Sequence, residues 1–127
     1  MNEDILADVL RFFAHRDSEY ALYQMLEERI LVHFPVERIR VQKTQIAFWA
    51  RHPFVIVSLR RAGGWPKHCI TLTLGLDHLL DSPRIAQAVE PYPNRWTHHV
   101  PISSPEQIDA ELLGWIEESF QFAQTKR

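Results

Sequence analysis

The chain has 127 residues, of which 46% are hydrophobic and 24% charged, and this composition is typical of one globular domain rather than a disordered segment. Its formal net charge of −2 provides no general attraction to nucleic acid or to an anionic membrane surface. The single cysteine, Cys69, excludes an internal disulfide and a multi-cysteine metal site. No apolar run approaches the roughly 20 residues that span a bilayer, and the acidic start of the chain is unlike a secretory signal. We expect a single cytoplasmic domain over residues 1–127 that is not inserted in a membrane.

Helical periodicity marks the N-terminal part of the chain. Apolar residues at helical spacing predict a first helix near residues 5–13, with Glu3 and Asp4 near its positive end. Asp17 or Ser18 is the predicted cap of a second helix. One face of that helix is predicted to pack in the core of the protein. Its apolar stripe consists of Ala21, Leu22, Met25, Leu26 and Ile30.

The middle of the chain predicts strands. Apolar and polar residues alternate over residues 36–42, 45–51 and 69–74, and a short apolar, β-branched run occupies residues 54–59. Pro53 is predicted to lie in a connection, and the loop 61–67 carries two of the four glycines. Because the loops between neighbouring runs are mostly short, antiparallel pairing is favoured.

After the fourth predicted strand, Asp81 and Ser82 followed by Pro83 predict the cap and first turn of a short helix ending near Val89. A fifth strand is predicted over residues 95–102, with Trp96, His98 and Val100 on one face and Thr97 and His99 on the other.

The C-terminal part predicts a long final helix. Ser104 is the predicted cap, Pro105 follows it, and Gln107 is placed for a capping box. The predicted buried face of this helix consists of Ile108, Leu112, Trp115 or Ile116, Ser119 and Ala123. The predicted fold is therefore α+β: an antiparallel sheet of about four or five strands packed with N-terminal helices and a long C-terminal helix, which together cover one face of the sheet.

Three phrases of the sequence carry a resemblance. They are VQKTQI at residues 41–46, LDSPRI at 80–85 and YPNRWTHH at 92–99. From about Phe12 to Ala123 the chain resembles a bacterial domain of unknown function, whose members occur alone or attached to other domains and are sometimes labelled predicted transport protein. It is more distantly similar to the small α+β domains grouped with YdhG and frataxin-like proteins. The resemblance implies a fold and supplies no catalytic residue.

The densest group of recognition side chains lies between Tyr92 and Val100. We predict a binding site for an anionic small molecule or peptide group, because arginine binds carboxylates and phosphates through two parallel hydrogen bonds. The alternative for each cation is an ordinary solvated surface charge. The candidate binding residues are Lys43, Arg51, Arg84, Tyr92, Arg95, His98 and His99.

The position of Arg84 in the sequence predicts that its charge is paired. In the first turn of the predicted short helix a cation is disfavoured by the helix dipole. We therefore expect Arg84 to pair with Asp81, Glu90 or a bound anion.

Metal, cofactor and catalytic motifs are missing from the sequence. Adjacent His98 and His99 on a strand point to opposite faces, so they cannot both ligate one metal ion. No phosphate-binding glycine loop or nucleophile elbow occurs, and Cys69 is predicted to be buried and inert. We predict no metal and no cofactor, and we favour a protein that is not an enzyme; an enzyme with a histidine acid–base group is the least favoured reading.

The main alternative to a ligand-binding module is a protein-interaction or homodimerising accessory domain. Its contact surface would include an exposed aromatic side chain such as Trp49 or Trp65. Nucleic acid is not favoured as a partner, because the net charge is negative and no basic run is present.

Overall fold

The structure is a computed structural model that describes residues 3–126, and it contains three α-helices, six strands and one 3-10 turn in that range. In chain order these elements are α1 (Glu3–Phe12), α2 (Asp17–His33), β1 (Arg38–Val41), β2 (Ile46–Ala50), β3 (His52–Ser58), β4 (Ile70–Leu76), β5 (Gln87–Tyr92), β6 (Arg95–Ile102), η1 (Pro105–Gln107) and α3 (Ala110–Gln124).

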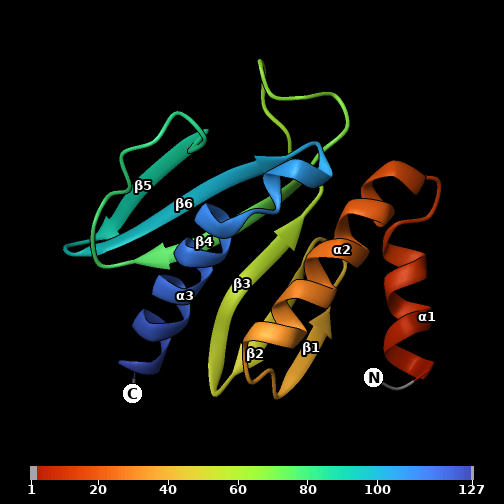
Figure 1. Cartoon of the computed structure of the whole chain (residues 1–127), viewed down its shortest axis with the longest axis horizontal. Helices are drawn as coiled ribbons and strands as arrows, with labels where there is room; N and C mark the ends of the chain where they lie inside the picture. Colours follow the sequence, from red (N-terminus) through yellow and green to blue (C-terminus); the bar gives the residue numbers. More distant parts are fainter. Residues whose placement is uncertain (1–2, 127) are drawn as a thin grey trace.

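All six strands belong to one antiparallel sheet with the order β1-β2-β3-β4-β6-β5 (Figure 1). The predicted α+β class and the long C-terminal helix are confirmed. The predicted number of four or five strands was too low, because β5 was not recognised as a strand.

One face of the sheet forms the core with the helices. In β4 the alternate residues Ile70, Leu72, Leu74 and Leu76 are all buried in this core, while Thr73 lies half-buried on the opposite face. The core cluster includes residues of α1, α2 and α3, and α3 packs against both β3 and β4. The helices therefore cover one face and leave the other face without a helical layer.

The predicted helical stripes are confirmed for α3 and only partly for the two N-terminal helices. Ile108, Leu112, Trp115, Ile116, Ser119 and Ala123 are all buried, as predicted for the final helix. Ile108 lies just before α3, which begins at Ala110 with Asp109 as its N-cap. The predicted capping box of Ser104 and Gln107 is present, but it caps the 3-10 turn η1 instead.

The buried face of α2 is rotated relative to the prediction. Ala21 and Met25 are exposed, whereas Glu19 and Tyr23 are buried beside the correctly predicted Leu22, Leu26 and Ile30. The predicted caps were also wrong: α2 begins at Asp17, with Arg16 as the N-cap and no side-chain cap hydrogen bond. In α1, Val9 and the following Phe13 are buried, but Leu6 is exposed.

The predicted helix from Asp81 to Val89 is absent. Ser82 forms only one turn, in which its carbonyl accepts from the Ile85 amide. From Ala86, whose amide donates to the His99 carbonyl, the chain pairs with β6 and becomes the edge strand β5. Hydrogen bonds to β6 thus replace those that a short helix would have formed within itself, and tertiary pairing overrides the local capping signal.

Pro53 is also placed differently from the prediction, because it lies inside β3 and faces Trp49 where the β2–β3 register shifts. A proline is tolerated at such an irregularity because a ladder hydrogen bond is already missing there. The tight turn before it is made by Arg51, which has a positive φ of 69°.

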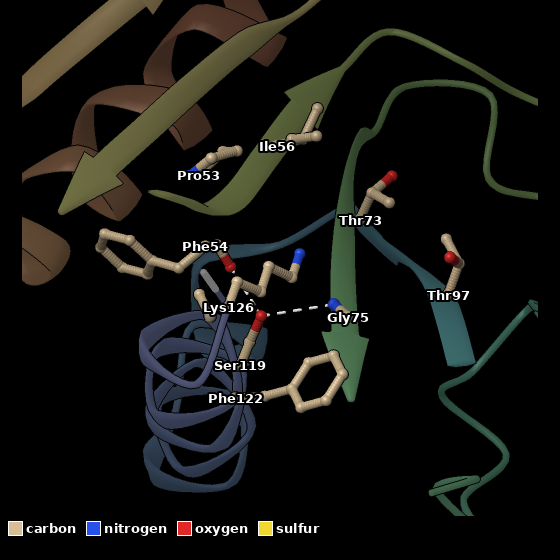
Figure 2. A pocket seen from close by; sticks show the side chains of 10 residues that line it. Pro53, Phe54, Ile56, Thr73, Gly75, Thr97, Ser119, Phe122 and Lys126 are labelled. Carbon is tan, nitrogen blue, oxygen red and sulfur yellow. Dashed lines mark hydrogen bonds between the residues drawn. The ribbon is translucent and has the colours of Figure 1, made fainter. Parts of the chain in front are cut away.

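The sheet divides between β3 and β4. These strands pair at only three positions, from Ile56 opposite Thr73 to Ser58 opposite Thr71. Beyond Ile56 the start of β3 and the end of β4 diverge, and α3 lies at the gap (Figure 2). The division leaves a cavity in the middle of the sheet.

Candidate functional site

A small cavity occupies the gap between β3 and β4, and we call it the inner cavity. Its volume is about 170 Å³. Its walls combine apolar side chains, three hydroxyl groups and one ammonium group, supplied by Pro53, Phe54, Ile56, Thr73, Gly75, Thr97, Ser119, Phe122, Ala123 and Lys126 (Figure 2). No carboxylate is among these lining residues.

Ser119 on α3 joins the two diverging strands. Its buried hydroxyl donates to the Phe54 carbonyl at 2.7 Å and accepts from the Gly75 amide at 3.3 Å, as the dashed lines in Figure 2 show. One serine thereby bridges the strands where direct pairing has ended. Because its proton is already donated to protein, the Ser119 hydroxyl is not free to donate to a ligand.

The other two hydroxyls of the inner cavity differ in their partners. Thr73 Oγ1 lies 2.9 Å from Nδ1 of His99, its cross-strand neighbour in the β4–β6 register. Thr97 makes no side-chain hydrogen bond among the described residues. Thr97 is thus the hydroxyl of this cavity that is fully available to a ligand.

A second, larger cavity adjoins the first at Lys126, and we call it the outer cavity. It has a volume of about 500 Å³ and is lined by His52, Arg95, Thr125 and Lys126. His52 Nε2 lies 3.2 Å from the Lys126 carbonyl, and the Lys126 ammonium lies 5.7 Å from the centre of the Phe122 ring. Within residues 3–126, Arg95, Lys126 and His52 form no ion pair.

The outer cavity is therefore locally cationic in a protein whose formal net charge is negative. Three basic residues from three separate segments line one space, and none of the lining residues is acidic. Such an arrangement leaves the positive charges to attract an anion from solution.

Of the residues predicted from the sequence, Arg95 lines the outer cavity and Tyr92 is its cross-strand neighbour in the β5–β6 hairpin. Tyr92 is 68% exposed, and the two-residue turn between them includes Asn94 with a positive φ of 62°. The hairpin thus brings these two predicted residues together at the edge of the sheet.

The other predicted cations lie outside both cavities. Lys43 follows β1 and lines a different hollow with Asp8 and Arg11. Arg51 forms the β2–β3 turn, where its backbone amide donates to the Glu37 carboxylate. The structure therefore does not bring Lys43 and Arg51 to Arg95.

Arg84 is held by carboxylates at the start of α3. Its guanidinium contacts Asp109 at 2.9 Å and Glu111 at 3.0 Å, donates to the Gln107 carbonyl at 2.6 Å and lies 5.4 Å from the centre of the Trp115 ring. The expected pairing of Arg84 is present, but with Asp109 and Glu111 rather than with Asp81 or Glu90. These hydrogen bonds raise the pKa of Arg84 despite partial burial, and Arg84 fixes the entry into α3.

The two histidines occupy opposite faces of β6, as predicted. His98 lies in the core, where its Nε2 accepts from the Leu80 amide at 3.0 Å and its Nδ1 makes no hydrogen bond of good geometry among the described residues. Burial lowers the pKa of His98, and it also lowers the pKa of His99 on the other face. His99 reaches the inner cavity only through Thr73.

Another hollow, which we call the third hollow, lies between the α1–α2 turn and the β3–β4 loop and also contains basic residues. It has a volume of about 560 Å³, and its lining includes Arg16, Arg61, Lys67 and His68. The buried carboxylate of Glu19 lies 3.5 Å from Arg16 and 3.4 Å from His68. Because Asp17 also lines it, this hollow carries its own neutralising charges.

The remaining aromatic and sulfur-containing candidates have identifiable surroundings. Trp49 is half-buried with the Arg38 guanidinium 4.1 Å from its ring centre, and Trp65 is half-buried in the β3–β4 loop. Cys69 is buried, and burial raises the pKa of its thiol. In residues 3–126 no group of three or more histidine, cysteine or acidic side chains could hold a metal ion.

Sequence reasoning did not select His52, Thr73, Thr97, Ser119 and Lys126 as site residues. Two signals were available: a serine on the apolar stripe of the last helix, and threonines alternating with leucines in β4. Neither signal indicates that the sheet divides at these positions.

Comparison with known proteins identifies a family and gives no activity. The family described as Domain of unknown function (DUF5655) matches residues 11–123. No curated protein and no solved structure matches the chain. No helix in the described part of the chain is long and apolar enough to cross a membrane. With more than half of its length matched, the chain belongs to the DUF5655 family.

Proposed function

We propose that the protein is a small binding module that holds an anionic group in the outer cavity. The observation that carries this proposal is the convergence of Arg95, Lys126 and His52 on a space without acidic lining residues. Arginine and lysine form charge-assisted hydrogen bonds with carboxylate and phosphate oxygens, and these bonds are about twice as strong as neutral ones.

The third hollow is a weaker candidate for the same role. It has more basic side chains, but Glu19 and Asp17 already neutralise part of their charge. An anion entering there would meet two carboxylates, whereas no carboxylate among residues 3–126 lines the outer cavity.

The experiment is a titration of the 15N-labelled full chain with inorganic phosphate and, separately, with acetate, at constant ionic strength because exposed charges are screened by salt. We expect the largest amide shifts at Arg95, Lys126 and His52. Arg95→Gln combined with Lys126→Gln should weaken binding by about tenfold or more.

The matched control is Arg61→Gln combined with Lys67→Gln, which removes the same two charges from the third hollow. This variant should bind both anions as the unmodified protein does. Equal losses in the two double variants would mean that only net charge matters, and the proposal would then be abandoned.

The interaction-domain alternative rests on β5, an edge strand with exposed Val89 and Tyr92. Glu90 and Pro91 in the same strand oppose edge-to-edge pairing, because a charge and a missing amide donor both disfavour it. Light scattering over a concentration series tests this alternative: a dimer that is lost in Val89→Glu would favour it.

A further inference from the structure

We infer that the ligand is a small hydroxylated organic anion, whose charged group lies in the outer cavity and whose hydroxylated body enters the inner cavity. This inference rests on the proposed function, and it adds the chemical class of the ligand. Its starting point is Lys126, which lines both cavities and therefore places an anion bound at its ammonium group beside the inner space.

The size of the inner cavity limits the body of the ligand. A volume of about 170 Å³ corresponds to roughly five or six water molecules at ~30 Å³ each. A body of only a few carbon and oxygen atoms can enter. A nucleoside or a long acyl chain is too large for this space.

The hydroxyl groups of the inner cavity determine its polarity. Ser119 is fully engaged with Phe54 and Gly75, and Thr73 shares its hydroxyl with His99. Thr97 retains both its donor and its acceptors, and Thr73 retains an acceptor or a donor, depending on the position of the shared proton. A purely apolar body would displace water from these hydroxyls without replacing its hydrogen bonds, and this loss lowers affinity.

The apolar walls are compatible with such a body. Pro53, Ile56 and Phe122 line the cavity beside Thr73 and Thr97, so a ligand there would place its carbon skeleton against the apolar residues and its oxygens near the threonines. Binding sites for small polar molecules commonly combine apolar contact with a few placed polar groups. The expected ligand is therefore a short polyhydroxylated chain that carries one anionic group. That group is either a carboxylate or a phosphate.

The test compares ligands that differ only in the body. Dissociation constants of the full chain are measured by NMR titration for D-glycerate against butyrate, and for glycerol 3-phosphate against inorganic phosphate. We expect D-glycerate to bind about tenfold more tightly than butyrate, because one to two additional hydrogen bonds form in a partly desolvated site. If D-glycerate binds more tightly than glycerol 3-phosphate, the anionic group of the ligand is a carboxylate. If glycerol 3-phosphate binds more tightly, the group is a phosphate.

The decisive variant is Thr97→Val, which removes one hydroxyl, keeps the shape and breaks no hydrogen bond within residues 3–126. It should abolish most of the preference for D-glycerate over butyrate, by weakening D-glycerate binding and tightening butyrate binding, because an apolar body no longer covers an unpaired Thr97 hydroxyl. Thr44→Val, in the exposed turn between β1 and β2, is the matched control and should keep the preference.

A steric variant tests entry into the inner cavity independently. A Cβ atom at Gly75 would meet no heavy atom closer than 4.0 Å, where the Phe122 ring lies, so Gly75→Ala is accommodated. It should weaken D-glycerate binding several-fold and leave acetate binding unchanged, because acetate has no body to place there.

The outcomes separate the two proposals. If phosphate, acetate and the hydroxylated ligands all fail to bind, both the proposed function and this inference are overturned. If anions bind at Arg95 and Lys126 but D-glycerate and butyrate bind equally, or the preference survives in Thr97→Val, only the hydroxylated body is rejected.

Discussion

Arg84 and Arg95 each lie within a distinctive phrase of the sequence, yet the fold surrounds them with opposite environments. Arg84 is 21% exposed as a side chain and contacts two carboxylates, a carbonyl and an indole ring. Arg95 is exposed and faces a cavity with two other basic side chains and no acid. The comparison teaches that the fold neutralises the charge of Arg84, whereas Arg95 has no ion-pair partner within residues 3–126.

The largest expected effect follows from removing Arg84. Arg84→Met should lower the free energy of unfolding by about 2–3 kcal/mol, because Asp109 and the Gln107 carbonyl lose a charged donor in a partly buried position. This change in unfolding free energy is measured by urea unfolding, monitored with far-UV circular dichroism.

Arg95→Met is the matched control, and it should change the unfolding free energy by less than about 0.5 kcal/mol. The loss of unfolding free energy in Arg84→Lys should lie between those of the two methionine variants. Lysine keeps the positive charge but lacks the planar guanidinium group that donates several hydrogen bonds at once. Equal effects of the methionine variants at positions 84 and 95 would erase the distinction between the two arginines.

A second, smaller effect concerns the rigidity of the cavity region. Ser119→Ala leaves the Phe54 carbonyl and the Gly75 amide without their bridging partner. We expect a loss of about 1–2 kcal/mol in unfolding free energy, with faster hydrogen exchange at the Gly75 amide. The exposed Ser103 provides the comparison, and Ser103→Ala should cost less than about 0.5 kcal/mol. An unchanged exchange rate at Gly75 would show that the two strands are held together without Ser119.

The smallest effect concerns a cation that pairs with an aromatic ring instead of a carboxylate. Arg38 lies 4.1 Å from the centre of the Trp49 ring, so Arg38→Ala should cost about 0.5–1 kcal/mol in a thermal unfolding measurement. Arg40→Ala, two residues further along β1, should cost less, since Arg40 has no such partner in the described chain. A larger loss at position 40 than at 38 would contradict this ranking of cation environments.

Sequence periodicity predicted the buried faces of several elements, because burial there depends on the repeat of a single helix or strand. The alternation in residues 95–102 predicted that His98 and His99 lie on opposite faces without deciding which one is in the core, and the predicted stripe of the final helix was correct at every position. Both patterns reflect one element facing one large apolar layer, which periodicity describes well.

The errors arose where a distant segment decides the local structure. Residues 87–92 form a strand because β6 offers an unpaired edge, while Ser82 and Pro83 suggested a helix. In α2 the buried face includes the charged Glu19, which is accommodated by Ser18, Arg16 and His68, and His68 lies 49 residues away.

The candidate site was predicted only in part for the same reason. Arg95 was selected from its neighbours in sequence, and it does line a cationic cavity. His52 and Lys126 line that cavity from the start of β3 and from just beyond the end of α3, while Arg95 begins β6, so their proximity depends on the course of three separate elements. Arg84 was selected by the same reasoning, and the acids that neutralise it lie more than 20 residues away.

The division between β3 and β4 has a consequence for how the chain acquires its structure during synthesis. The strands β1, β2 and β3 form one consecutive antiparallel ribbon, while β4, β6 and β5 form the other half of the sheet. These halves pair directly at only three described positions, and α3, which is synthesised after both of them, packs against β3 and β4. We expect a nascent chain lacking α3 to hold two loosely associated ribbons, and to become one cooperative unit only when that helix has emerged.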